Sequence, residues 1–282
     1  FFFFFFFFCF FFFFFFFLKK NLIELIINYF FCFPLKSLPY NPRKLQSMIQ
    51  PDGSLNLLEA KIMKQLLHPN LTRLLDIYHT ETYVYLVQEL VEGKELFDLI
   101  QSERKTGLSE ERIFKIFSQI VSVVQYLHVS NVIHNDLKVE NMLVDENDHI
   151  TLLDFGHSFL ASGEGQDSKF PGISTLEYTA PETLLYSQCT SESEVWSLGV
   201  ILFVLVYGRI PFDGHHFLMR QLISEAKYTF PTKRVVSEEC RDLISKMLVL
   251  EPKDRLTLDG IKSHPWMFEK MQHYNRSELE AQ

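Results

Sequence analysis

The stretch His134 to Asn141 constrains this chain more than any other part of it, because its polar residues fall at offsets that suit a single reaction. It reads His-Asn-Asp-Leu-Lys-Val-Glu-Asn, and Asp154 opens an Asp-Phe-Gly turn shortly after it. Asp136 can accept a proton from a hydroxyl, and Lys138 can neutralise a negatively charged group. Asn141 and Asp154 supply the oxygen atoms that Mg²⁺ prefers. Phosphoryl transfer needs positioning and charge neutralisation rather than covalent chemistry, so the pattern predicts that reaction.

Three further motifs follow in the second half of the chain. Ala-Pro-Glu stands at 180–182, and Arg255 lies in an Asp-Arg-Leu-Thr run. Between them, Val195 to Tyr207 is too short to span a bilayer and predicts a buried helix that stops at Gly208. The order and spacing of these motifs resemble those of the serine/threonine protein kinases over about residues 55 to 268.

Shorter segments carry a finer resemblance. His-Pro-Trp at 264–266 is similar to the end of the domain in the calcium/calmodulin-dependent group of kinases. The segments 154–158 and 92–98 resemble the checkpoint-effector branch of that group. The resemblance also implies that Arg255 pairs with Glu182 of the Ala-Pro-Glu motif.

The resemblance implies an α+β fold, the bilobal protein-kinase-like fold, with a small, mostly β lobe that is incomplete here and a large, mostly α lobe. The expected kinase-like domain covers 55–268, with a hinge near 88–94. A poly-Phe leader at 1–18 and a segment at 19–54 without clear period precede it, and a tail at 269–282 follows.

Local patterns predict elements within this domain. Apolar residues at helical spacing predict a helix over 55–67, which in kinases is the regulatory helix. The β-formers at 82–87 predict a strand. Ser109 followed by acidic residues predicts the start of an amphipathic helix over 109–128. The polar run 145–148 predicts a turn between two short strands.

By resemblance, Asp136 is the general base or orienting carboxylate, and Lys138 follows the serine/threonine pattern. Asn141 and Asp154 hold Mg²⁺, and the substrate is a protein with a serine or threonine hydroxyl.

The ATP site follows from the same resemblance. Glu89 and Val91 offer backbone groups to adenine, and Leu143 lies beneath the ring. Glu95 meets the ribose or a basic substrate residue; the alternative is a solvated acid at a helix start. Lys36 pairs with Glu59 of the regulatory helix. The assignment of Lys36 stays open, because Pro34 would remove a hydrogen bond from a central strand.

Several residues depart from the family pattern. The first glycine is Gly53, so no Gly-x-Gly-x-x-Gly loop precedes the regulatory helix. Asn135 replaces an arginine and lacks its bidentate contact with a phosphorylated activation loop. Glu194 replaces an aspartate, and with one more methylene it is expected to be too long for the same backbone hydrogen bonds. Ser174 replaces a glycine. Two functions therefore remain: an active kinase that uses ATP and Mg²⁺, and a catalytically inactive kinase-fold scaffold, or pseudokinase.

Composition narrows the partners and the compartment. The formal net charge of −8 argues against non-specific nucleic-acid binding. The cysteines are far apart, which favours reduced thiols and a cytoplasmic location. Residues 1–17 are phenylalanine except for Cys9, and with Leu18 they are long enough for a membrane anchor with the kinase domain on the cytoplasmic side. Low complexity is the favoured interpretation of this leader, because a homopolymer has no pattern to specify packing.

Overall fold

The computed structural model describes residues 35–50, 55–161, 172–173 and 175–272. The chain divides into two compact units, which are residues 1–60 with 73–90, and residues 61–72 with 91–282. The predicted leader at 1–18 and Pro34 lie outside the described residues, as does Ser174. Among the described residues, no helix is long and apolar enough to cross a membrane.

The first unit is built on an antiparallel sheet with the strand order β1-β3-β2. Its strands are β1 (Leu35–Pro39), β2 (Leu74–His79) and β3 (Tyr83–Gln88). Strand β3 is central and its middle is buried, as its run of β-formers predicts. Strand β1 pairs with it so that Lys36 lies opposite Leu86.

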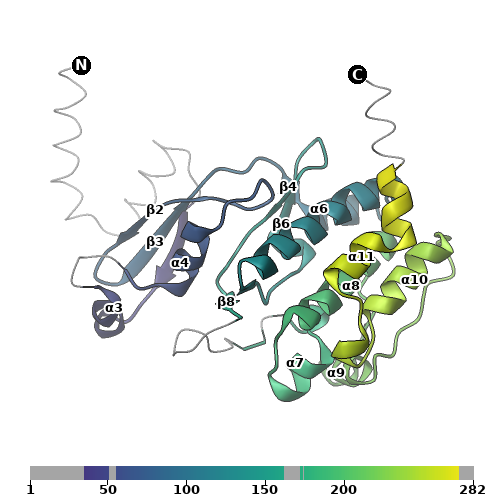
Figure 1. The fold of residues 1–282 in the computed structure, drawn as a ribbon. Coiled ribbons are helices and arrows are strands. Elements are labelled where there is room, and N and C mark those ends of the chain that lie inside the picture. Colours follow the sequence, from purple (N-terminus) through teal and green to yellow (C-terminus); the bar gives the residue numbers. More distant parts are fainter. Residues whose placement is uncertain (1–34, 51–54, 162–171, 174, 273–282) are drawn as a thin grey trace. The chain divides into compact units, whose positions relative to one another are not determined.

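Helix α3 (Pro42–Met48) packs on this sheet (Figure 1). Asn41 caps it by accepting a hydrogen bond from the Arg43 N–H, and Pro42 occupies the first turn, where its missing N–H costs nothing. The core below it is aliphatic, and its buried members are Leu45, Leu57, Ala60, Val84 and Leu86. Neither α3 nor β1 could be assigned from the sequence.

Helix α4 (Leu58–Gln65) begins in the first unit and ends in the second. It is shorter than the predicted range of 55–67. At its start, Leu55 forms a β-bridge with Ile49 instead of a helical turn. At its end, Pro69 disfavours helical backbone in the residue before it, and the chain leaves the helix after Gln65.

The second unit is mostly helical (Figure 1). Its helices are α5 (Leu96–Ser102), α6 (Glu110–Val129), α7 (Pro181–Tyr186), α8 (Ser191–Tyr207), α9 (His216–Ser224), α10 (Glu238–Met247) and α11 (Leu258–Ser263). Helix α6 confirms the predicted amphipathic helix, and the Ser109 side chain accepts a hydrogen bond from the Arg112 N–H at its start.

Helix α8 is the centre of this unit and packs against α6 and α10. Nearly all of it is buried, which agrees with its uninterrupted apolar sequence. Gly199 allows α10 to approach, since a Cβ there would lie 3.0 Å from the Cβ of Met247, the last residue of α10, and 2.9 Å from Leu248 just after it. The helix ends as predicted at Gly208, which has the left-handed φ of 65°.

Short strands carry the functional loops of the second unit. Strands β4 (Lys94–Glu95), β6 (Met142–Val144) and β7 (Ile150–Leu152) form one sheet, in the order β4-β6-β7. The predicted turn at 145–148 joins β6 to β7. Strand β5 (Val132–Ile133) pairs with β8 (Phe159–Leu160). The stretch His134 to Asn141 therefore leaves β5 and enters β6.

Candidate active site

Asp136 is the centre of a compact hydrogen-bonded group. Its side chain is 6% exposed. Its Oδ2 lies 2.8 Å from Lys138 Nζ and accepts a hydrogen bond of 2.8 Å from Asn141 Nδ2. Its Oδ1 accepts a hydrogen bond of 2.9 Å from the hydroxyl of Thr175. Both oxygens of this carboxylate thus have defined partners.

The hydroxyl of Thr175 lies between a carboxylate and an ammonium group. It donates to Asp136 and accepts a hydrogen bond of 2.8 Å from Lys138 Nζ. General-base catalysis at an alcohol requires a carboxylate that can accept the hydroxyl proton. Here a cation also lies next to the hydroxyl oxygen. Thr175 shows that an alcohol fits between these two side chains.

Asn141 and Asp154 carry the side-chain oxygen atoms that the sequence predicts to bind Mg²⁺. The Asn141 amide nitrogen donates to the Asp136 carboxylate and, at 3.0 Å, to the Asp136 carbonyl oxygen. The amide oxygen therefore faces the opposite side and can bind a cation. Asp154 has a left-handed φ of 56°, and its Oδ1 accepts a hydrogen bond from the Gly156 N–H. The Leu153 N–H donates to the Asn141 carbonyl, which ties the two segments together.

This donor set fits Mg²⁺ together with a nucleotide. Mg²⁺ is usually bound through one or two protein carboxylates, water and substrate phosphates rather than by a complete protein cage. No group of three or more His, Cys, Asp or Glu side chains that could hold a metal ion occurs among the described residues.

Glu194 of α8 supports the stretch that carries Asp136. One of its oxygens accepts hydrogen bonds of 2.9 Å from both the His134 and the Asn135 backbone N–H groups. Its other oxygen lies 2.6 Å from His128 Nε2. The prediction that Glu194 is too long for the backbone bonds is therefore wrong, because the extra methylene lets the carboxylate reach His128 as well.

His134 packs inside this region and is fully buried. Its Nε2 lies 3.1 Å from the Leu153 carbonyl oxygen, and its Nδ1 accepts a hydrogen bond from the Asp136 N–H. One donating and one accepting nitrogen define a neutral imidazole. Burial lowers the pKa of His134, which agrees with that neutral form.

A buried ion pair anchors the Ala-Pro-Glu turn at the start of α7. Arg255 makes two parallel hydrogen bonds of 2.7 Å to the two oxygens of Glu182, which confirms the predicted pairing. It also lies over the ring of Trp196, 5.2 Å from its centroid. Ser193 donates to Glu182 at 2.7 Å. This network fixes the C-terminal end of the segment that carries Thr175.

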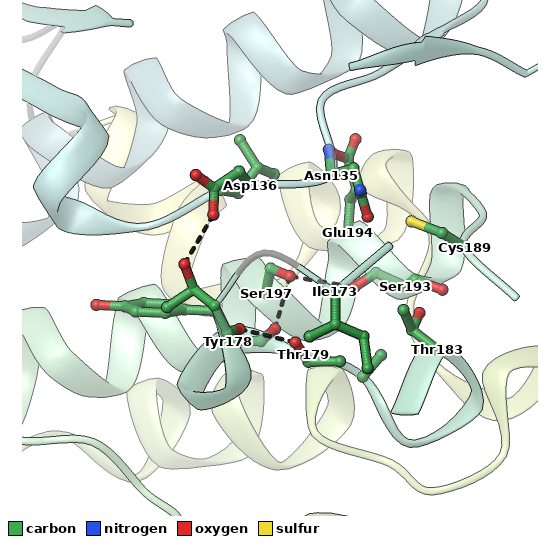
Figure 2. A pocket seen from close by; sticks show the side chains of 13 residues that line it. Asn135, Asp136, Ile173, Tyr178, Thr179, Thr183, Cys189, Ser193, Glu194 and Ser197 are labelled. Atoms are coloured by element: carbon green, nitrogen blue, oxygen red, sulfur yellow. Dashed lines mark hydrogen bonds between the residues drawn. The ribbon is translucent and has the colours of Figure 1, made fainter. Parts of the chain in front are cut away.

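A small pocket lies between the Asp136 stretch, the residues around Thr175 and α8 (Figure 2). Polar side chains line much of it, among them Asp136, Thr179, Ser193, Glu194 and Ser197. Ser197 donates a hydrogen bond to the Tyr178 carbonyl, and Thr179 donates one to the Thr175 carbonyl. The backbone around Thr175 is therefore held by α8 and by its own turn.

Within the first unit, Lys36 and Glu59 lie together. Lys36 Nζ is 2.6 Å from Glu59 Oε1, and Glu59 is buried. Glu89 follows β3, and its backbone N–H donates to the Arg73 carbonyl while its side chain accepts from the Arg73 N–H. The backbone group that Glu89 can offer to a ligand is therefore its carbonyl.

Within the second unit, Glu95 and Leu143 are direct partners in the β4–β6 pairing. Gly93 makes the approach to β6 possible. A Cβ at Gly93 would lie 2.7 Å from the Val144 carbonyl oxygen, and its φ of 142° also favours glycine. Val91 precedes this close approach and is partly exposed.

Comparison with known proteins decides the family. The protein kinase domain family matches residues 42–267 of the chain. The chain belongs to the protein kinase family. It is 40% identical over 210 residues to the probable serine/threonine-protein kinase KIN1 homolog of Enterocytozoon bieneusi. The matched residues are 74% of this chain and 34% of that protein. It is also 40% identical over 219 residues to the human SNF-related serine/threonine-protein kinase, covering 74% of this chain and 27% of that protein.

A third similar kinase is serine/threonine-protein kinase SIK2 of Gallus gallus, with 39% identity over 212 residues, 74% of this chain and 26% of that protein. The chain thus spans about a quarter to a third of the length of these relatives. The comparisons confirm the predicted α+β kinase fold and the resemblance to serine/threonine kinases.

The structure also shows contacts that the sequence patterns do not indicate. The hydrogen bonds that the Thr175 hydroxyl donates to Asp136 and accepts from Lys138 join segments that are distant in sequence, and so does the contact between His128 and Glu194. A local pattern contains no signal for such pairs. The position of Thr175 shortly before the Ala-Pro-Glu motif is the one local hint that it lies near Asp136 and Lys138.

Proposed function

We propose that this chain is a serine/threonine protein kinase that transfers the γ-phosphate of ATP to a hydroxyl group of a protein. The observation that carries the proposal is the position of the Thr175 hydroxyl, which donates to Asp136 and accepts from Lys138. A substrate hydroxyl would meet the same two groups. Membership of the protein kinase family supports the proposal.

In the proposed reaction, the substrate oxygen attacks the γ-phosphorus while the bond to the leaving oxygen of ADP breaks. Asp136 accepts the hydroxyl proton, and Lys138 offsets negative charge that develops on the transferring group. Asn141 and Asp154 would hold Mg²⁺, which supplies positive charge next to the phosphates. Asn141 also keeps the Asp136 carboxylate in place through its amide.

The remaining predicted residues are proposed to bind ATP. The ion pair with Glu59 holds the Lys36 ammonium in place, as a phosphate-binding lysine requires. The Glu89 carbonyl and the backbone of Val91 would bind adenine, and Leu143 would lie beneath the adenine ring. Glu95, the strand partner of Leu143, would face the ribose or a basic substrate residue.

The kinase-like domain is proposed to cover 55–268 in a cytoplasmic protein. For the subgroup, we favour the SNF-related type over the checkpoint-effector branch that two short segments predict. The support is 40% identity to the human SNF-related kinase over 219 residues. Phosphorylation of a panel of peptides with different flanking residues, compared with that relative, would test this choice.

Phosphate incorporation by the purified full chain tests the function. Labelled ATP, Mg²⁺ and a basic peptide with one serine should give labelled peptide, and Asp136→Asn should reduce the rate by at least about 10²-fold. Asp98→Asn is the matched control, because this aspartate is exposed on α5. Equal rates for wild type and Asp136→Asn would refute the proposal and favour the pseudokinase scaffold.

A further inference from the structure

Asn135, which replaces the family's arginine, contacts two separate places in the segment between the Asp-Phe-Gly and Ala-Pro-Glu motifs. Its Nδ2 donates a hydrogen bond of 3.2 Å to the Gly172 carbonyl and a longer one of 3.4 Å to the His157 carbonyl. An amide nitrogen carries two N–H groups, so it can make both contacts at once. The carbonyls belong to residues that flank the part of the segment outside the described residues.

The backbone of Asn135 explains why an asparagine suits this position. Its φ is 62°, in the left-handed region where asparagine is several-fold enriched over most residues. Its N–H donates to Glu194 at 2.9 Å, which fixes the backbone next to Asp136. The side chain is partly buried and starts from a fixed point.

Gly172 supplies a matching feature on the other side of the contact. Its φ is 107°, a conformation that residues with a side chain rarely adopt. A Cβ at this position would meet nothing within 4 Å, so space does not require the glycine. The backbone conformation that presents its carbonyl to Asn135 does require it.

We propose that Asn135 is a positioning residue, whose side-chain amide ties the start of this segment, at His157, and its later part, at Gly172, to the stretch that carries Asp136. The segment continues into Ile173 and Thr175, and Thr175 contacts the catalytic carboxylate. The amide bridge, meaning the two hydrogen bonds from Asn135 to Gly172 and His157, thus holds the substrate side of the site against Asp136. This inference rests on the proposed kinase function.

Asn135→Asp tests the bridge with little change in shape. Aspartate also tolerates the left-handed backbone, but it has no N–H to donate and places a charge against two carbonyl oxygens. Loss of the bridge should lower kcat/KM for the peptide by about ten- to hundredfold while the KM for ATP changes less than about threefold. Asn147→Asp makes the same chemical change at an exposed position and is the control.

A second variant separates the bridge from a general loss of folding. Gly172→Ala should lower kcat/KM for the peptide in the same direction, because the alanine cannot readily keep φ at 107°. If both variants break one bridge, the double variant should be less impaired than the product of the two single effects. Fully multiplicative effects would contradict the shared bridge.

Hydrogen exchange provides a readout that does not depend on activity. Backbone amides in 157–161 and 175–178 of the full chain should exchange faster in Asn135→Asp and remain unchanged in Asn147→Asp. If the wild type transfers no phosphate, the kinase proposal fails while the exchange difference still decides the bridge. If Asn135→Asp matches Asn147→Asp in exchange, the positioning role is refuted.

Discussion

The ion pair between Arg255 and Glu182 gives the sharpest prediction for stability. The Arg255 side chain is 0% exposed and that of Glu182 is 8% exposed. Besides its two bonds to Glu182, Arg255 donates to the carbonyls of Val249, Glu192 and Leu250. Arg255→Met keeps an apolar chain of similar length but leaves the Glu182 charge and these carbonyls without their donor.

The expected magnitude follows from burial. Removing one partner of a buried ion pair costs about 3–5 kcal/mol, because the remaining charge stays uncompensated. A domain of this size loses about 2–4 °C in Tm for each kcal/mol, so Arg255→Met should lower Tm by roughly 6–20 °C. Replacing both partners with apolar residues, as in Glu182→Leu with Arg255→Met, should recover much of this loss.

The assay is urea unfolding of the full chain, followed by tryptophan fluorescence and checked by thermal melting. The control is Lys246→Met, which removes the cation from an exposed pair with Asp242, where the side chains are 50% and 49% exposed. Exposed pairs contribute about 0–1 kcal/mol, so this variant should unfold close to the wild type. Equal losses for Arg255→Met and Lys246→Met would refute the reasoning from burial.

Three further predictions concern residues of the candidate site and its supporting contacts. The shorter side chain in Glu194→Asp cannot contact both His128 and the backbone N–H groups. The loss of one charged hydrogen bond should lower kcat by about tenfold, and an unchanged kcat would contradict this prediction. Lys36→Met should reduce kcat/KM for ATP by about 10²-fold or more, and Lys61→Met at an exposed position of α4 should not. Burial lowers the pKa of His134, so its contribution to stability should be complete above about pH 6.5 and fall as the pH drops below that value. The urea midpoint of the wild type should therefore be lower at pH 5.5 than at pH 7.5, and His134→Gln should reduce this difference.

The helices and strands with strong local patterns could be predicted from the sequence. Helix α6 has a cap, charged first turn and one apolar face, and α8 has a long apolar run that ends at Gly208. Strand β1 could not be predicted, because its residues are only partly buried and gain their structure by pairing with β3. Helix α3 is held by Leu45 in the core, which a seven-residue segment cannot reveal.

The candidate site also has a part that the sequence predicts and a part that it does not. The short offsets among Asp136, Lys138 and Asn141 are local, so the sequence contains them. The contacts of Glu194 with the stretch that carries Asp136 depend on how α8 packs, and for this reason the sequence does not show that the longer side chain fits. The amide bridge of Asn135 depends on the left-handed backbone of two residues, which no spacing pattern predicts.

Transfer of labelled phosphate from ATP by the full chain tests the central claim most directly. Single-turnover transfer to a serine peptide in the presence of Mg²⁺ should occur in the wild type and fall by at least about 10²-fold in Asp136→Asn, with the label on the serine hydroxyl by mass spectrometry. Label that appears at the same rate in both proteins, or in neither, would contradict the assignment of Asp136 as the residue that accepts the hydroxyl proton.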